Sequence, residues 1–232
     1  MNILITGAGR GLGYEMTSEA LERGHAVVAG VRSPNETNEK LSALAEKYGD
    51  RLSIVELDVT KEEGIAALAS QLKEQGMSLG AIINNAAILN ARNTQIEQLD
   101  FTDVALTMDI NVYGPMRVVK HFLSLLTEKD AAIFNISSEA GSITHAYPGD
   151  YPYAISKTAL NMFTQQLHVY LQKRGIQVLS IHPGWMRTDM GGGEAPLDAS
   201  HSARGIIGLL EQRRTPDSRF MFVDHEGNSM PI

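Results

Sequence analysis

Tyr153 and Lys157 are the residue pair with the clearest chemical potential, because no other tyrosine in the chain has a lysine four residues later. On a helix, this spacing places both side chains on one face. A nearby ammonium favours the phenolate, so we expect a lowered tyrosine pKa and general acid–base chemistry near neutral pH. Ser138, at the end of the apolar run 131–136, offers a hydroxyl that can orient a carbonyl oxygen. Taken alone, the pair also fits an ordinary exposed helix pair.

Four glycines follow the apolar, β-branched run Asn2–Thr6, and they are Gly7, Gly9, Gly11 and Gly13. A segment with helical spacing comes next and stops at a further glycine. Glycines let backbone N–H groups approach a ligand closely, and the positive end of the helix stabilises an anion. Strand, glycine turn and helix together predict a pyrophosphate-binding turn. The alternative is a glycine-rich turn that binds no ligand.

Two arginines favour one dinucleotide cofactor over another. The second predicted strand, residues 25–31, ends at Arg32 with no acidic residue, and Arg10 lies inside the glycine turn. An acidic residue at this strand end would bind the ribose hydroxyls of NAD, whereas an arginine pairs with the 2′-phosphate of NADP. The sequence therefore predicts NADP(H). The alternative is that Arg32 is a solvated arginine that follows a strand.

Further strand ends carry polar residues. Asp58 follows the third predicted strand and Asn85 the fourth, so both are expected at the carboxyl edge, where sheets of this kind bind ligands. Asp58 or Thr60 would also suit the N-cap of the next helix, and the two roles of Asp58 are compatible. His182 ends the sixth strand and is interpreted as a loop or core histidine, because the proton donor is already supplied.

Strand-like and helix-like runs alternate along the chain, which predicts an α/β fold with right-handed crossovers. The predicted strands are 2–6, 25–31, 52–57, 79–83, 131–136, 176–181 and 219–223, and the later predicted helices are 36–48, 61–75, 96–126, 151–173 and 199–212. We predict a single domain over residues 1–232, a Rossmann fold with a doubly wound, seven-stranded parallel sheet and helices on both faces. A kink or a freed carbonyl group is expected at Asn111 and Gly114, and a flexible substrate lid over 190–196.

Composition excludes several classes of protein. A net charge of −7 argues against a nucleic-acid partner, and the absence of cysteine excludes disulfides and thiolate metal sites. We predict no metal centre. No apolar run reaches the length of a membrane span, and the chain enters its first strand without a charged leader, so a cytoplasmic protein with no membrane partner is expected.

These motifs resemble those of the short-chain dehydrogenase/reductase family over nearly the whole chain. The runs TGAGRGLG, VRSP, ALNM and HPGWMRTDMGG are similar to its branch of C-factor-like and sniffer-like carbonyl reductases. One departure is Ala87, which stands where the family's NNAG motif has glycine, and whose extra methyl group restricts the backbone. Another is a slightly longer loop between Ser138 and Tyr153, which reshapes the pocket.

The resemblance implies a catalytic tetrad and a cofactor site. The implied tetrad is Asn111, Ser138, Tyr153 and Lys157. In the family, the asparagine anchors a water beside the lysine, the lysine binds the nicotinamide ribose, the Asp58 equivalent contacts adenine and the Pro-Gly turn packs on the nicotinamide. The implied cofactor-binding residues are Gly7, Arg10, Gly11, Leu12, Gly13, Arg32, Asp58, Val59, Asn85, Ala86, Ala87, Tyr153, Lys157, Pro183, Gly184 and Thr188.

The expected function is NADPH-dependent reduction of an aldehyde or ketone to an alcohol, or the reverse oxidation, by an enzyme of the class EC 1.1.1.-. The alternative is an NADP-binding signalling or regulatory protein of the C-factor type, in which turnover is incidental. A homodimer or homotetramer is also expected, because the helices at 96–126 and 151–173 carry more apolar residues than one stripe needs. Phe163 is expected to face the partner. The alternative is that the extra apolar residues of these helices pack under the lid and the C-terminal tail.

Overall fold

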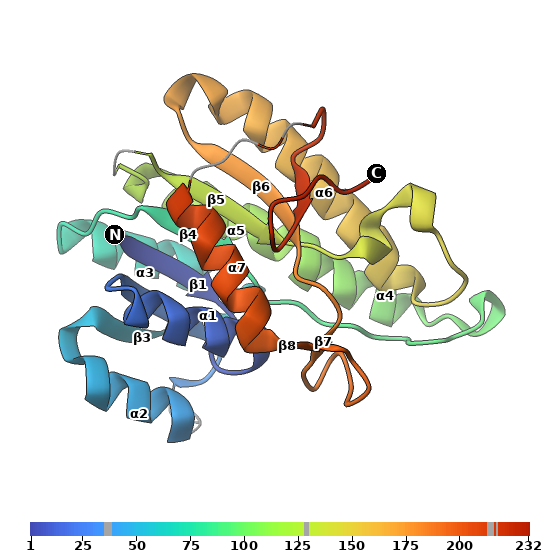
Figure 1. Cartoon of the computed structure of the whole chain (residues 1–232), viewed down its shortest axis with the longest axis horizontal. Helices are drawn as coiled ribbons and strands as arrows, with labels where there is room; N and C mark the ends of the chain where they lie inside the picture. The colour runs from blue at the N-terminus through green and yellow to red at the C-terminus, as the bar shows by residue number, and fades with distance from the viewer. Residues whose placement is uncertain (35–38, 128–129, 213–215, 217) are drawn as a thin grey trace.

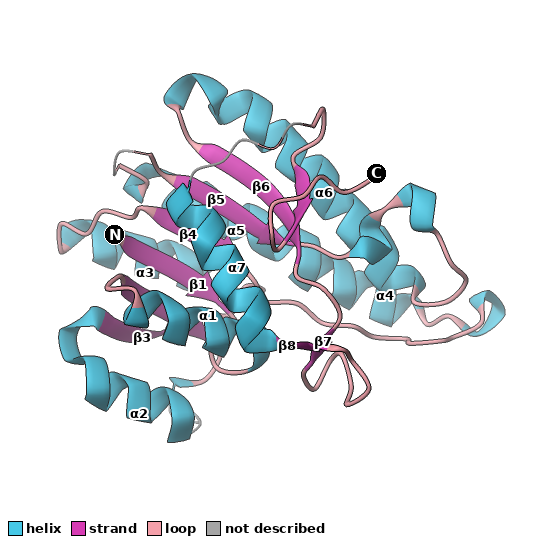
Figure 2. Ribbon diagram, in the orientation of Figure 1, coloured by secondary structure: helices cyan, strands magenta, loops and turns pink. Residues whose placement is uncertain are grey.

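Seven parallel strands form one twisted sheet in the computed structural model, which describes residues 1–34, 39–127, 130–212, 216 and 218–232 (Figures 1 and 2). The spatial order of the strands is β3-β2-β1-β4-β5-β6-β9, and every pairing is parallel. The strands are β1 Asn2–Thr6, β2 Ala26–Val31, β3 Leu52–Glu56, β4 Ala81–Asn84, β5 Ala132–Ile136, β6 Gln177–His182 and β9 Phe222–Asp224. The predicted fold class is confirmed.

Helices cover both faces of this sheet, as Figure 1 shows. One face carries α1 Gly11–Glu22, α2 Glu39–Tyr48 and α7 Ala199–Gln212. The other carries α3 Glu62–Glu74, α4 Phe101–Met108, α5 Gly114–Phe122 and α6 Tyr151–Leu171. Among the described helices, none combines the length and apolar character that crossing a bilayer requires. The cytoplasmic location stays a prediction.

The two faces enclose two separate apolar cores. Side chains alternate between the faces of a strand, so Ile3 and Ile5 of β1 enter the core under α1 and α7, while Leu4 enters the core under α3 and α5. Met16 and Phe122 are examples of the helical side chains that fill each core, and both are fully buried. Burial on both faces explains why the central strands are nearly continuous apolar runs.

The order of the strands reverses beside β1. From this strand the chain moves outward to β2 and β3, and then returns to place β4 on the other side of β1. Open sheets of this kind bind ligands at the carboxyl ends of the strands, at the point where the order reverses. The glycine turn begins there, directly after Thr6.

The segment predicted as one helix over 96–126 is interrupted several times. A short 3-10 turn at Ile96–Gln98 precedes α4, and a π-helical turn at Asp109–Tyr113 separates α4 from α5. The helix is therefore irregular at the place where poor helix formers were expected to disturb it. Gly114 follows the π turn. A larger residue would not fit at this position, because its Cβ would lie 2.9 Å from the Cβ of Val59.

Two other predicted elements differ at their boundaries. The last strand begins at Phe222, three residues later than the prediction of 219–223. Residues 36–38 of the predicted helix 36–48 lie outside the described residues, and α2 begins at Glu39. The region predicted as a lid, 190–196, is flanked by the two short strands β7 Met186–Arg187 and β8 Leu197–Asp198, which pair in a small sheet that the sequence analysis missed.

Candidate active site

A cleft of about 1210 Å³ opens at the carboxyl edge of the sheet. This exceeds the roughly 300–1,000 Å³ typical of a pocket for one small ligand, so a dinucleotide and a second molecule have room together. Of the site residues predicted from the sequence, all but two line the cleft. The exceptions are Gly13 and Asn111, and both have a structural explanation.

The glycine turn has the geometry of an anion cradle. Gly7 and Gly11 have φ angles of +66° and +52°, which favour glycine. A Cβ on Gly13 would collide with the carbonyl oxygen of Gly7 and with the side chain of Asn85, so the third glycine permits the turn to pack against its own helix. The turn therefore presents backbone N–H groups at the start of α1, where an anion is stabilised. These features fit the pyrophosphate of a dinucleotide.

Asn85 and Ala86 hold this turn in place from the neighbouring strand. The backbone N–H groups of both donate to Oγ1 of Thr6, each at 3.0 Å. The side-chain amide of Asn85 donates to the carbonyl oxygens of Thr6 at 3.0 Å and Gly7 at 3.2 Å. Ala87 lines the cleft and is not among the described residues with positive φ, so the missing glycine causes no backbone strain here.

The far end of the cleft carries the two predicted arginines. Arg32 lies in the wall with Asp58 and Val59, beyond the end of β2. The carboxylate of Asp58 accepts hydrogen bonds from the backbone N–H of Thr60 at 2.9 Å and from its hydroxyl at 2.8 Å. This bond shapes a turn and not a helix cap, since Lys61 occupies the N-cap of α3. Neither candidate cap was therefore correct.

Arg10 projects from the glycine turn to the cleft's outer rim. Its guanidinium forms an exposed ion pair with Asp189 at 3.0 Å, across the mouth of the cleft. Exposed pairs of this kind contribute at most about 1 kcal/mol, so Arg10 can exchange this partner for another anion at little cost.

Ser138, Tyr153 and Lys157 come together at the centre of the cleft. Helix α6 supplies the tyrosine and the lysine, and Ser138 follows β5. The Lys157 ammonium lies 5.4 Å from the centre of the Tyr153 ring and donates a hydrogen bond of 2.7 Å to the carbonyl oxygen of Ile136. The Ser138 hydroxyl lies close enough to Tyr153 to lower the pKa of the phenol. The i and i+4 spacing therefore places both groups in the cleft, and not on an outer helix face.

Electrostatics at these groups differ from the expectation of a lowered tyrosine pKa. Burial raises the pKa of Tyr153, and the nearby Ser138 hydroxyl only partly offsets that effect. Burial also lowers the pKa of Lys157 to about 7, because the interior disfavours its charge. The expectation was wrong for this structure, since a lysine that is itself desolvated is charged in only part of the molecules at neutral pH.

Asn111 lies in the π-helical turn and is fully buried. Its side chain accepts a hydrogen bond from the backbone N–H of Ile88 and donates to the carbonyl oxygen of the same residue, both at 2.9 Å. It also donates to the hydroxyl of Ser156 at 3.0 Å. Asn111 thus connects the loop after β4 to helix α6, one turn from the catalytic candidates, and its side chain does not enter the cleft.

The Pro183–Gly184 turn and Thr188 form the wall opposite α6. Gly184 has a φ of +85°, and the Thr188 hydroxyl accepts a hydrogen bond from the N–H of Gly191 at 3.1 Å. His182 accepts a hydrogen bond at Nδ1 from the backbone N–H of Glu139 at 3.1 Å, and burial lowers its pKa. A neutral histidine that holds a loop agrees with the interpretation of His182 as structural.

Comparison with known families decides what kind of protein carries this site. A family model described as short chain dehydrogenase matches residues 1–196. The chain belongs to the short-chain dehydrogenase family. It is therefore a member of an oxidoreductase family, and the resemblance of its motifs to this family is confirmed.

The relatives of this chain differ in the functions that their names describe. Human 17-beta-hydroxysteroid dehydrogenase type 2 is 34% identical over 194 residues, which are 82% of this chain and 48% of that protein. The chain spans about half the length of the human protein and of a rat relative. The C-signal of Myxococcus xanthus is 33% identical over 152 residues, which are 65% of this chain and 90% of that protein.

Solved structures of the family superpose closely on this chain. The carbonyl reductase Sniffer of D. melanogaster has a TM-score of 0.91 at 29% identity, covering 100% of this chain and 99% of that one. An NADPH-bound carbonyl reductase from chicken fatty liver has a TM-score of 0.90 at 32% identity, with coverage of 100% and 98%.

In this short-chain dehydrogenase, the outer part of the cleft contains residues that the sequence analysis missed. A side-chain N–H of Arg92 donates to the carbonyl oxygen of Met190 at 2.7 Å, which joins two loops across the cleft. The Tyr147 hydroxyl donates to Asp150 at 3.3 Å, and burial with this carboxylate raises the pKa of Tyr147 to about 12. Their only signal in the sequence was a position in loops that follow strand ends.

Proposed function

We propose that the protein is an NADPH-dependent reductase of aldehydes or ketones, with the reverse alcohol oxidation as the same reaction run backwards. The observation that carries the proposal is the meeting of Ser138, Tyr153 and Lys157 beside a glycine cradle in one cleft. The cradle, the two arginines and the volume of the cleft fit a phosphorylated dinucleotide. Bound NADPH supplies the hydride that reduces the carbonyl carbon.

The side chains of the site bind the reactants and transfer the proton. Ser138 holds the carbonyl oxygen by a hydrogen bond, close to the hydroxyl of Tyr153, whose pKa it affects. Tyr153 donates its proton to that oxygen, and its raised pKa keeps the proton in place until the substrate oxygen becomes basic. Lys157 binds the nicotinamide ribose with its ammonium group. The prediction that Asn111 anchors a relay water stays a prediction, while its side chain positions α6.

Lys157 also links the reaction to pH. Its pKa of about 7 makes it a proton donor and acceptor at neutral pH, close enough to the Tyr153 ring to exchange protons with it through an intervening hydroxyl. Ribose hydroxyls in hydrogen-bond contact with the lysine would provide such a hydroxyl. The lysine thus resupplies the proton that Tyr153 gives away.

Arg32 and Arg10 set the preference for NADP(H) over NAD(H) in this proposal. An arginine at the end of β2 pairs with a 2′-phosphate, and the described strand end offers no carboxylate to hold two ribose hydroxyls. The NADPH-bound carbonyl reductase from chicken supports the same choice, since it shares the fold over the whole chain. Asp58, Val59, Pro183–Gly184 and Thr188 are proposed to contact the cofactor as the sequence analysis expected.

The loop over 190–196 is proposed as the substrate lid. Arg92 holds its first residue from the opposite side of the cleft, and the indole N–H of Trp185 donates to the carbonyl oxygen of Gly191 at 2.8 Å. These bonds join the lid to the floor of the site at two points. Substrate binding is therefore expected to depend on both loops.

Consumption of NADPH with a panel of aldehydes and ketones tests the proposal. We expect turnover with at least one carbonyl class, and Tyr153→Phe is expected to lower kcat by roughly 10²–10⁴-fold while NADPH still binds. Tyr170→Phe serves as the control, because Tyr170 is exposed on α6 far from the cleft lining. Equal rates for the wild type and Tyr153→Phe would contradict the assigned proton donor.

A signalling role is the second candidate, and the similarity to the C-signal of Myxococcus xanthus is the observation that favours it. In that case NADPH would bind with the expected affinity, but no carbonyl in the panel would be reduced. The two functions are separated by one measurement, since cofactor binding without turnover supports the signalling role.

We also propose a homo-oligomer, dimer or tetramer, built on helices α4 and α6. Large apolar side chains are exposed along these helices, with Phe101 at 78%, Ile155 at 56% and Met162 at 62%. Such exposure is typical of an interface. Phe163, the residue chosen from the sequence, is partly buried against the core under α3 and α5, so the exposed Met162 is the better residue for the test.

Light scattering distinguishes the assembly from the single chain of 25.3 kDa. A multiple of this mass is expected, and Met162→Glu is expected to dissociate the assembly by placing a charge in the apolar contact. The matched control is Gln71→Glu, which introduces the same charge at an exposed position on α3, outside the proposed interface. A mass equal to that of one chain would contradict the proposal.

A further inference from the structure

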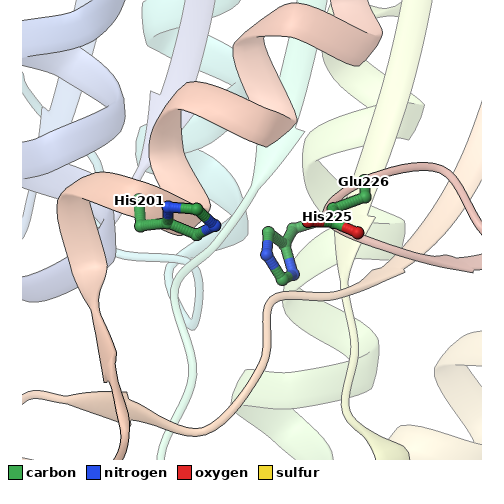
Figure 3. A group of neighbouring side chains, drawn as sticks. All are labelled: His201, His225 and Glu226. Atoms are coloured by element: carbon green, nitrogen blue, oxygen red, sulfur yellow. The ribbon is translucent and has the colours of Figure 1, made fainter.

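Two histidines and a glutamate gather outside the cleft, where the start of α7 meets the loop after β9. His201 lies in the first turn of α7, and His225 and Glu226 follow β9 directly. Figure 3 shows the two imidazole rings facing each other, with Glu226 beside His225. One potential ligand atom from each residue lies within 4.8 Å of the others.

His225 gives this cluster its chemical significance. Both nitrogens of its ring are buried, and neither has a hydrogen-bond partner among the described residues. A buried polar atom without a partner costs about 1–3 kcal/mol, so such atoms are normally satisfied by a ligand or another group. The ring of His201 lies 5.4 Å away, edge to face, which satisfies neither nitrogen.

The backbone around the cluster is held rigidly. The carboxylate of Asp224 accepts hydrogen bonds from the N–H groups of Glu226 and Asn228, both at 2.9 Å. Helix α7 approaches so closely that a Cβ on Gly205 would collide with the carbonyl oxygen of His225. The three side chains are therefore presented by a fixed backbone, and only their own rotations adjust the distances between them.

We propose that His201, His225 and Glu226 bind a divalent transition-metal ion, with Zn²⁺ as the best match. Two imidazoles and one carboxylate form a ligand set that zinc accepts, with water in the fourth position. In a tetrahedral site with bonds of about 2.0–2.2 Å, two donors of one ion lie about 3.4 Å apart. Metal binding would therefore require rotations of the exposed His201 and Glu226 side chains, because the donor atoms lie within 4.8 Å of one another in this structure.

The position of the site indicates a structural ion. None of the three residues lines the cleft. The ring of His225 instead lies beside Gly184. A Cβ atom added to Gly184 would lie 3.8 Å from Cε1 and Nδ1 of the ring. The hydroxyl of Ser202, one residue beyond His201, donates to the carbonyl oxygen of Pro183 at 2.6 Å. The ion would thus join α7 and the loop after β9 behind the Pro183–Gly184 turn.

Calorimetric titration of the untagged full chain with Zn²⁺, and with Co²⁺ as a spectroscopic probe, tests this site. We expect one ion per chain, a visible Co²⁺ absorption band typical of nitrogen and oxygen ligands, and a raised Tm with Zn²⁺. His201→Gln and His225→Gln should each weaken binding by roughly tenfold or more. Glu226→Gln should weaken it in the same direction.

His168→Gln is the matched control, because His168 lies on α6 away from the cluster. This variant should bind Zn²⁺ with the affinity of the wild type. His201 is exposed, so His201→Gln keeps the test valid even where His225→Gln impairs folding. The inference is wrong if no saturable binding is found, or if both histidine variants bind like the wild type. Because the readout is metal binding, the outcome does not depend on whether the protein reduces carbonyls.

Discussion

The two ends of the cleft are built in different ways. At the cofactor end, the wall consists of residues that directly follow strands, and hydrogen bonds such as those from Asn85 to Thr6 join neighbouring strand ends. At the substrate end, the wall consists of loops that are joined to one another, as Arg92 is to Met190. A ligand at the first end meets a framework fixed by the sheet, whereas a ligand at the second end meets loops that are fixed by single bonds.

Lys157 lies where the two ends meet, and its burial gives the largest expected effect. Its pKa is lowered to about 7, while an unfolded lysine titrates at about 10.4. Between these values the unfolded chain binds the extra proton, so this group makes the free energy of unfolding rise with pH. Relative to Lys157→Met, the wild type should gain on the order of a few kcal/mol between pH 7 and pH 10.

Urea unfolding of both proteins across this pH range measures the difference, and Lys173→Met in the exposed turn that follows α6 is the control. A difference that stays constant with pH would show that Lys157 is charged inside the folded protein.

Gly13→Ala tests the packing of the glycine turn at the cofactor end of the cleft, and Gly9→Ala is its matched control. The new methyl group at Gly13 would collide with the turn, whereas at Gly9 it would make an ordinary contact 3.4 Å from Val31. Overpacking typically costs about 1–3 kcal/mol, so only Gly13→Ala should lower the Tm clearly and weaken NADPH binding. Equal Tm values for the two variants would contradict the claim that the glycine turn packs tightly at Gly13.

Arg32→Asp tests the part of the cofactor end that is proposed to select NADPH over NADH. NADPH should bind the wild type at least roughly tenfold more tightly than NADH, since one charge-assisted bond is lost with NADH. The variant should lose or reverse this preference, while Arg32→Lys should keep part of it. Dissociation constants for both cofactors decide the matter, and a wild-type preference for NADH would contradict the assignment of NADP(H).

Arg92→Ala should have the smallest effect and should act only at the substrate end. Removing its exposed bond to Met190 is expected to raise the KM for a carbonyl substrate a few-fold, which corresponds to about 1 kcal/mol. The Kd for NADPH should stay unchanged, as it should in the control Arg174→Ala. A weaker NADPH affinity with an unchanged KM would mean that the two ends are not independent.

The sequence predicted the fold and the cofactor end well, because both follow from local patterns. Alternating apolar runs defined the strands, and the residues directly after them, such as Asp58, Asn85 and Ser138, all line the cleft. Even the interruption near Asn111 was expected, since asparagine and glycine are poor helix formers.

Other features depend on contacts between distant segments, and the sequence could not supply them. The raised pKa of Tyr153 results from burial, which spacing alone does not reveal. Phe163 was placed outward because periodicity defines a helix face only approximately. His201 and His225 lie on different elements, so their proximity required the structure.

The bonds between Asn85 and the turn after β1 also bear on how the chain folds during its synthesis. The glycine turn is synthesised before β4, and the backbone amide that anchors it at Thr6 lies 79 residues later. At roughly 5–20 residues per second, translation takes on the order of ten seconds to reach it. Until then β1 lacks its partner β4, so nascent chains that stop before Asn85 cannot complete the turn, however well their first strands and helices form.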